Sequence, residues 1–136
     1  MREAPEPRPA ARVLVVDDDD EMRALLRRTL EFDGYEVIDR DRGTHVMEAL
    51  RGAPFDLIIL DKEMPGLTGL DLLSIVSREF PHVPVVLVTA FGGPHVAASA
   101  LRLGAASYLE KPFRLGQLRQ VMDGLLTRSS DETRAS

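Results

Sequence analysis

The chain has 136 residues but no cysteine and no long apolar run. Without cysteine it forms neither disulfides nor thiolate metal sites, and a reducing compartment is weakly favoured. No stretch approaches the length of a membrane span, and the Pro-rich, charged N-terminus lacks the apolar segment of a secretory signal. We therefore expect a cytoplasmic protein with no membrane contact.

Positive charge is also in short supply. Lysine and arginine total 17 against 22 aspartates and glutamates, which leaves a net charge of -5. A non-specific nucleic-acid binder needs a basic face to neutralise phosphates, so we expect no direct nucleic-acid binding by this chain. With 44% apolar and 29% charged residues, the composition is that of a globular domain, and the length suits one such domain.

Both ends of the chain differ in composition from the middle. Residues 1–11 are Pro-rich and charged, and residues 127–136 are polar. Such segments cannot bury enough apolar surface to fold by themselves. We expect a disordered N-terminal tail over 1–11, a folded domain over 12–126, and a polar tail or truncated linker over 127–136.

Strand and helix signals alternate through the middle of the chain. Apolar runs predict strands at 12–16, 35–38, 56–60, 85–89 and 107–109, and apolar residues at helical spacing predict a helix after each strand. The third helix should begin at Thr68, because Thr68-Gly69-Leu70-Asp71 matches a capping box in which two side chains bond each other's backbone amides. This alternation indicates an α/β fold whose parallel sheet is covered on both faces.

Three of the predicted strands end in polar side chains. Asp17 and Asp18 follow the first apolar run, Asp61 follows the third and Thr89 the fourth. If these strands are parallel neighbours, their carboxyl ends converge on one crevice, which is where ligands bind in such sheets. Two carboxylates about 4 Å apart repel by roughly 4 kcal/mol at an effective dielectric near 20. A bound divalent cation is the simplest relief for this cluster.

Four motifs occur in a fixed order along the chain: Val15-Val16-Asp17-Asp18, Leu60-Asp61 with Met64-Pro65-Gly66, Val88-Thr89-Ala90, and Lys111-Pro112-Phe113. Each is weak by itself, but together, over residues 12–126, they resemble the receiver domain of two-component response regulators. The resemblance implies a flavodoxin-like, doubly wound five-stranded parallel sheet of order 2-1-3-4-5 with five helices. It also implies a phosphoprotein that works in phosphorelay signal transduction.

The resemblance assigns roles to the acids. It implies that Asp61 accepts a phosphoryl group from a partner histidine kinase or phosphotransfer protein in a Mg²⁺-dependent reaction, forming an aspartyl phosphate. Asp18 and Asp61 would bind Mg²⁺ directly, Asp17 through water, and the backbone carbonyl of Glu63 would complete the protein ligands. Lys111 would hold a phosphoryl oxygen as a compact cation.

The resemblance further implies a conformational switch. The Thr89 hydroxyl would move toward the phosphoryl group and the Tyr108 ring would then turn inward, while a cis bond before Pro112 would aim Lys111 into the crevice. Glu63 and Phe91 occupy positions where the family tunes hydrolysis of the phosphate. Switching would change the face built from the fourth helix, fifth strand and fifth helix, and so control an output domain or protein, transcription being one such output.

The sequence is also compatible with two other functions. A phosphohydrolase of the haloacid dehalogenase type wants a second aspartate two residues after its nucleophile, and this chain has Glu63 there, so we expect no enzyme. A phosphate-independent interaction module is the second alternative. Ser107 stands where one subgroup of the family has an aspartate that forms an inter-subunit salt bridge, so we do not expect a dimer of that kind. Phosphorylation could still promote a different homodimer, with contacts through Val96, Ser99, Arg102 and Arg119.

Some acidic and basic residues near these motifs carry no assigned chemistry. Asp19 and Asp20 lie where a helix should begin, and the helix dipole favours negative charge there. His45, His82 and His95 are scattered and share no ligand spacing, so we expect them on the surface.

Overall fold

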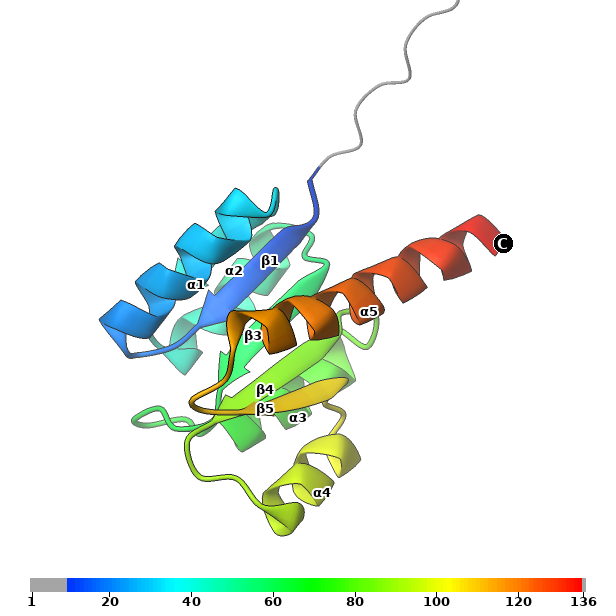
Figure 1. Ribbon diagram of the computed structural model, residues 1–136. Coiled ribbons are helices and arrows are strands. Elements are labelled where there is room, and N and C mark those ends of the chain that lie inside the picture. The colour runs from blue at the N-terminus through cyan, green and yellow to red at the C-terminus, as the bar shows by residue number, and fades with distance from the viewer. Residues whose placement is uncertain (1–9, 136) are drawn as a thin grey trace, which may run out of the picture.

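The computed structural model of the protein describes the backbone of residues 10–135 and the side chains of residues 10–126. Strands and helices alternate along the chain, with one 3-10 turn at Gly43–His45 before the second helix (Figure 1). In chain order the elements are β1 (Arg12–Val16), α1 (Asp20–Phe32), β2 (Glu36–Arg40), α2 (Val46–Gly52), β3 (Leu57–Asp61), α3 (Gly69–Glu79), β4 (Val85–Thr89), α4 (Pro94–Arg102), β5 (Ser107–Glu110) and α5 (Leu115–Ala135).

The five strands form one parallel sheet in the order β2-β1-β3-β4-β5, which confirms the predicted fold class and strand order. The register aligns the carboxyl ends of the three central strands, because Val16 of β1 pairs with Leu60 of β3, and Leu60 pairs with Leu87 of β4. The residues that follow these three positions therefore reach the same edge of the sheet.

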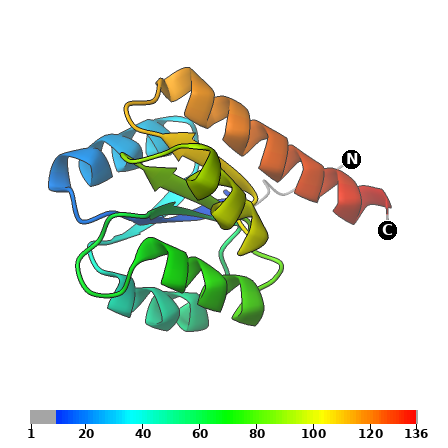
Figure 2. The same ribbon diagram turned by 90° about the horizontal axis from the view of Figure 1, so that it is seen from below.

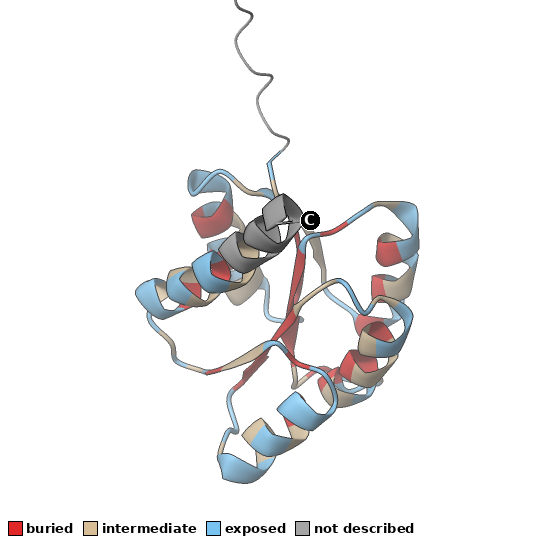
Figure 3. Ribbon diagram, turned by 90° about the vertical axis from the view of Figure 1, so that its right-hand side faces the viewer, coloured by how far each residue is buried: buried red, intermediate tan, exposed pale blue. Residues whose placement is uncertain are grey.

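Helices cover both faces of the sheet, and the core is split into two layers (Figures 2 and 3). Alternate residues of a strand point to opposite faces, so Leu14 and Val16 pack against α2, α3 and α4 while Val13 and Val15 pack against α1 and α5. All four are at most 1% exposed. A strand buried on both faces explains why its sequence is a continuous apolar run.

Side-chain caps set where two of the helices begin. Asp19 is the N-cap of α1, and its carboxylate accepts from the backbone amides of Glu21 and Met22, as expected for this acidic stretch. Thr68 caps α3 by accepting from the Asp71 amide at 3.2 Å. Within residues 10–126 the Asp71 carboxylate accepts no return bond from the Thr68 amide, so only half of the predicted capping box forms. Aspartate is one methylene shorter than the glutamate usual at that position.

The last helix is longer than the sequence suggested. Its backbone is helical to Ala135, whereas residues 127–136 were expected to form a polar tail. Helix growth is cooperative once the first turns are fixed, and Leu118 and Met122 fix them by packing in the core. Residues 1–9 of the predicted N-terminal tail lie outside the described residues. Among the helices that the structure describes, none combines the length and apolarity needed to span a membrane.

Gly69, the first residue of α3, lies against the end of β3. A Cβ atom at this position would be 2.5 Å from the Asp61 carbonyl oxygen and 2.5 Å from the Lys62 Cα, both backbone atoms that cannot turn aside. We therefore expect Gly69→Ala to lower the free energy of unfolding by about 2 kcal/mol, the usual cost of overpacking, in urea denaturation followed by circular dichroism.

Gly124→Ala is the matched control for Gly69→Ala. Gly124 lies inside α5, and a Cβ atom there would meet nothing within 4 Å. This substitution should leave stability unchanged or raise it by up to about 1 kcal/mol, because alanine favours a helix interior over glycine. Equal stability of the two variants would contradict the close approach of α3 to β3.

Candidate functional site

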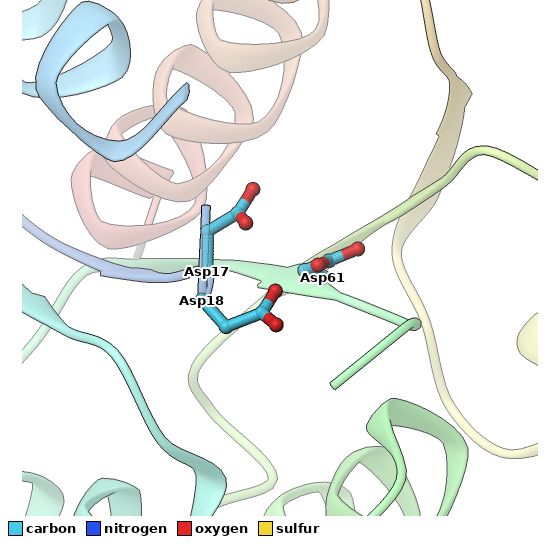
Figure 4. A group of neighbouring side chains, drawn as sticks. All are labelled: Asp17, Asp18 and Asp61. Carbon is cyan, nitrogen blue, oxygen red and sulfur yellow. The ribbon is translucent and has the colours of Figure 1, made fainter. Parts of the chain in front are cut away.

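Three aspartates converge at the carboxyl edge of the sheet (Figure 4). Asp17 and Asp18 follow β1, Asp61 is the last residue of β3, and one carboxylate oxygen from each lies within 4.8 Å of the others. Asp17 and Asp61 are 2% and 3% exposed, whereas Asp18 is exposed to solvent. The predicted convergence of these side chains is therefore observed, with two acids buried and one at the rim.

Lys111 supplies a positive charge to this acidic cluster. It follows β5, and its Nζ lies 3.3 Å from Asp17 Oδ2 and 3.6 Å from Asp61 Oδ1. The Lys111-Pro112 peptide bond is cis, as the resemblance implied. The cation thus contacts both buried carboxylates.

The charges perturb one another because Asp17 and Asp61 are almost fully buried. Burial and the negative charge of Asp17 raise the pKa of Asp61 to about 7, although Lys111 and the Glu63 backbone amide act in the opposite direction. Burial alone would lower the pKa of Lys111, but Asp17 and Asp61 outweigh it and raise that pKa. Lys111 therefore stays charged, while Asp61 exchanges a proton near neutral pH.

The donor set fits a hard divalent cation. Three carboxylates offer oxygen ligands close together, and one of them faces solvent, as Mg²⁺ requires if it is to keep several waters. One lysine does not neutralise three carboxylates, so the cluster retains net negative charge to attract a cation. The residues at the site are thus suited to Mg²⁺.

Thr89 ends β4 and is fully buried beside this cluster. Its hydroxyl donates to Glu63 Oε2 at 2.6 Å, and its oxygen accepts from the Phe91 amide at 3.0 Å. The Ala90 amide donates to the other Glu63 oxygen, Oε1, also at 2.6 Å. The Glu63 carboxylate therefore joins the loop after β3 to the loop after β4.

The sequence did not predict this function of the Glu63 side chain. It indicated only a backbone carbonyl ligand for Mg²⁺ and a position where the family tunes hydrolysis of the phosphate. The signal available was an acid two positions beyond Asp61, on the loop beside β4. Burial alone would raise the pKa of Glu63, but the hydrogen bonds from Thr89 and Ala90 outweigh burial and lower it. The carboxylate is thus held in its ionised form.

Tyr108 lies on β5, half-buried, with its hydroxyl turned toward the loop after β4. The hydroxyl donates to Glu110 Oε1 at 2.7 Å and accepts from the Gly93 amide at 3.1 Å. Burial and the bond to Glu110 raise the pKa of Tyr108. Its proposed switching motion stays a prediction, but the bonds that such a motion must break are identified.

The histidines and the predicted dimer contacts lie on elements other than those that carry the three aspartates. His45, His82 and His95 are exposed, as expected. Arg119 of α5 donates to both carboxylate oxygens of Asp33, at 2.7 and 3.1 Å, and so already has a partner at the end of α1. Val96, Ser99 and Arg102 lie on α4.

The fold thus brings three aspartates, a lysine and a threonine together at the carboxyl edge of one parallel five-stranded sheet. Residues 13–123 match the response regulator receiver domain family, and the chain belongs to that family. This confirms the resemblance drawn from the four motifs.

Individual relatives agree with this assignment. The chain is 42% identical over 104 residues to the response regulator protein FleR of Pseudomonas aeruginosa, covering 76% of this chain and 22% of FleR. It is 38% identical over 105 residues to the DNA-binding transcriptional regulator NtrC of Escherichia coli, covering 77% of this chain and 22% of NtrC. The chain thus spans under a quarter of the length of these two relatives.

Solved structures show the same fold. The chemotaxis protein CheY4 of Vibrio cholerae has a TM-score of 0.81 at 30% identity, with 86% of this chain and 99% of that chain covered. The receiver domain of NtrX from Brucella abortus has a TM-score of 0.80 at 32% identity, with 85% and 98% covered.

The raised pKa of Asp61 predicts how stability depends on pH. The folded carboxyl binds its proton more tightly than the unfolded one, so its contribution to stability is complete below pH 4 and is lost as the pH rises through about 7. Asp61→Asn removes this ionisation. In metal-free buffer, we expect the variant to exceed the wild type in free energy of unfolding by a few kcal/mol at pH 8.

The excess stability of Asp61→Asn should shrink toward zero as the pH falls to 4, as measured by urea denaturation across this range. Asp71→Asn is the control, since Asp71 is exposed in the first turn of α3 and should show no such trend. A difference between Asp61→Asn and wild type that is independent of pH would contradict the raised pKa.

Proposed function

We propose that the chain is a phosphorylation-controlled switch in which Asp61 accepts a phosphoryl group from the phosphohistidine of a partner histidine kinase or phosphotransfer protein. The observation that carries this proposal is the Asp61 carboxylate at the end of β3, within 3.6 Å of the Lys111 ammonium and beside Asp17 and Asp18. Membership in the receiver family supports the same role.

The transfer needs little covalent chemistry from the protein. An Asp61 oxygen attacks phosphorus, the bond from phosphorus to the donor imidazole nitrogen breaks, and the released imidazole takes up a proton from solvent. Lys111 lies close to both buried acids, so its ammonium can pair with the Asp61 carboxylate before transfer and with a phosphoryl oxygen after it. Thr89 contributes a hydroxyl donor for a second oxygen.

Asp17, Asp18 and Asp61 would hold Mg²⁺, with the Glu63 carbonyl as a further ligand. When bound, such an ion would supply positive charge that offsets the negative charge of the phosphoryl oxygens. Without it, a phosphoryl group would approach a crevice that already contains three carboxylates and one lysine.

We propose that the phosphorylated domain acts in the cytoplasm through the face formed by α4, β5 and α5, which would control an output domain or protein. NtrC is a DNA-binding transcriptional regulator, so transcription is one such output. A phosphorylation-dependent homodimer through the same face is part of this proposal, whereas catalytic turnover and direct nucleic-acid binding by this chain are not.

Incubation with acetyl phosphate or phosphoramidate and Mg²⁺ should add one phosphoryl mass to the intact protein. Asp61→Asn should abolish this gain, since an amide cannot form the acyl phosphate, and the exposed Asp71→Asn should retain it. Mass spectrometry of the freshly desalted protein is the measurement.

The outcomes of the phosphorylation experiment separate the alternatives. Persistent absence of the mass with both donors would favour a phosphate-independent interaction module. Sustained turnover of a simple phosphate ester, lost in Asp61→Asn, would favour a phosphohydrolase instead.

Magnesium should bind to the folded protein in the absence of any phosphoryl donor and should raise its melting temperature in proportion to ln(1 + [Mg²⁺]/Kd). Asp18→Asn removes a proposed direct ligand that is exposed to solvent, so it should fold normally but weaken the affinity for Mg²⁺ by at least about tenfold. Differential scanning fluorimetry across a Mg²⁺ titration measures this. Equal shifts in Asp18→Asn and wild type would contradict the assignment of Asp18.

A further inference from the structure

The Glu63 carboxylate occupies a small anion site formed by the end of β4. Its two oxygens accept from different donors, Oε2 from the Thr89 hydroxyl and Oε1 from the Ala90 amide, each at 2.6 Å. Both distances are at the short end for their type, as expected for bonds to an ionised acceptor. Two convergent donors at the edge of the crevice form a site for an oxyanion, and Glu63 fills it.

The same site lies next to Asp61. The Glu63 backbone amide donates to Asp61 Oδ1 at 3.2 Å. The negative charge of the Glu63 side chain also contributes to the raised pKa of Asp61. Asp61 pairs in register with Val88 of β4, the residue before Thr89. A phosphoryl group on Asp61 would therefore lie beside the end of β4, where Glu63 now holds the Thr89 and Ala90 donors.

We propose that Glu63 is an internal competitor of the phosphoryl group: its carboxylate occupies the Thr89 hydroxyl and the Ala90 amide, and must release both before they can bind phosphoryl oxygens. This inference rests on the proposed function, because it assigns a positioning role within the same reaction. This role of Glu63 differs from the tuning of phosphate hydrolysis, because it concerns the affinity of the protein for the phosphoryl group and not the attack of water on it.

Competition of this kind lowers the affinity of the site for the phosphoryl group. Thr89 cannot donate its single hydroxyl proton to two acceptors, and Ala90 has one amide hydrogen. The charge-assisted hydrogen bonds to Glu63 therefore compete with hydrogen bonds to the phosphoryl oxygens. Thr89 keeps its bond to Glu63 until the bonds to the phosphoryl group are the more favourable. Lys62 Nζ, 3.5 Å from Glu63 Oε2, is a nearby cation that the released carboxylate retains as partner.

The test compares the affinity of four proteins for beryllofluoride, a non-covalent phosphoryl mimic, at saturating Mg²⁺. The proteins are the wild type, Glu63→Gln, Glu63→Asp and Glu48→Gln. Glu63→Asp keeps the charge but is shorter by one carbon–carbon bond, about 1.5 Å, so it cannot hold both donors. Glu48→Gln removes a charge from an exposed position on α2.

We expect Glu63→Gln and Glu63→Asp to bind beryllofluoride about tenfold more tightly than the wild type, and Glu48→Gln to match the wild type. The Ala90 amide proton, followed by NMR before the mimic is added, should already move upfield in both Glu63 variants, because its short bond to a carboxylate is weakened or lost. This second readout does not depend on phosphate chemistry.

Each other outcome is decisive. If Glu63→Asp binds like the wild type while Glu63→Gln binds more tightly, charge alone acts and the competition is overturned. Equal affinity in all four proteins also overturns it and leaves the proposed function standing. Failure of all four to bind the mimic, with no phosphoryl mass gained from small donors, overturns the proposed function together with the competition.

Discussion

The balance of charge between Asp17, Asp61 and Lys111 is the constraint on which the site depends. Two carboxylates that are almost fully buried at neighbouring strand ends repel each other, and one ammonium within 3.6 Å of both offsets only part of that repulsion. The remaining imbalance makes the crevice receptive to a cation and keeps the proton of Asp61 exchangeable near neutral pH. The surrounding sheet supplies the rigidity that prevents these side chains from moving apart.

The fold was predictable because its determinants are local and periodic. Strands buried on both faces appear as runs such as Val13–Val16, and the parallel arrangement places whatever follows each run at one edge of the sheet. Asp17, Asp61 and Thr89 could therefore be placed at one edge of a parallel sheet from their positions alone. The strand order and the contribution of Lys111 needed the family resemblance, because periodicity does not say which strands are neighbours or where a flexible lysine reaches.

The contacts that sequence reasoning did not find join residues far apart in the chain. Glu63 and Thr89 are 26 positions apart, and Arg119 and Asp33 are 86 apart, so no local pattern links either pair. The first contact follows from where the loop after β3 turns, and the second from where α5 lies relative to the end of α1. The extent of α5 was missed for a different reason: polar composition suggested an unstructured segment, whereas a helix fixed in the core at Leu118 and Met122 continues beyond its last apolar turn.

The helices differ in how much buried apolar surface attaches them to the sheet. Helix α1 buries Leu26 and Leu30, and the two-bond ion pair between Asp33 and Arg119 connects its end to α5, which buries Leu118 and Met122. Helix α4 buries only the methyl group of Ala100 among its residues. Since a buried methyl is worth less than about 1 kcal/mol, α4 is anchored by less buried apolar surface than α1 or α5. This weakly anchored helix follows directly on the loop that begins after Thr89, so a rearrangement of that loop would meet less resistance from α4 than from α1 and α5.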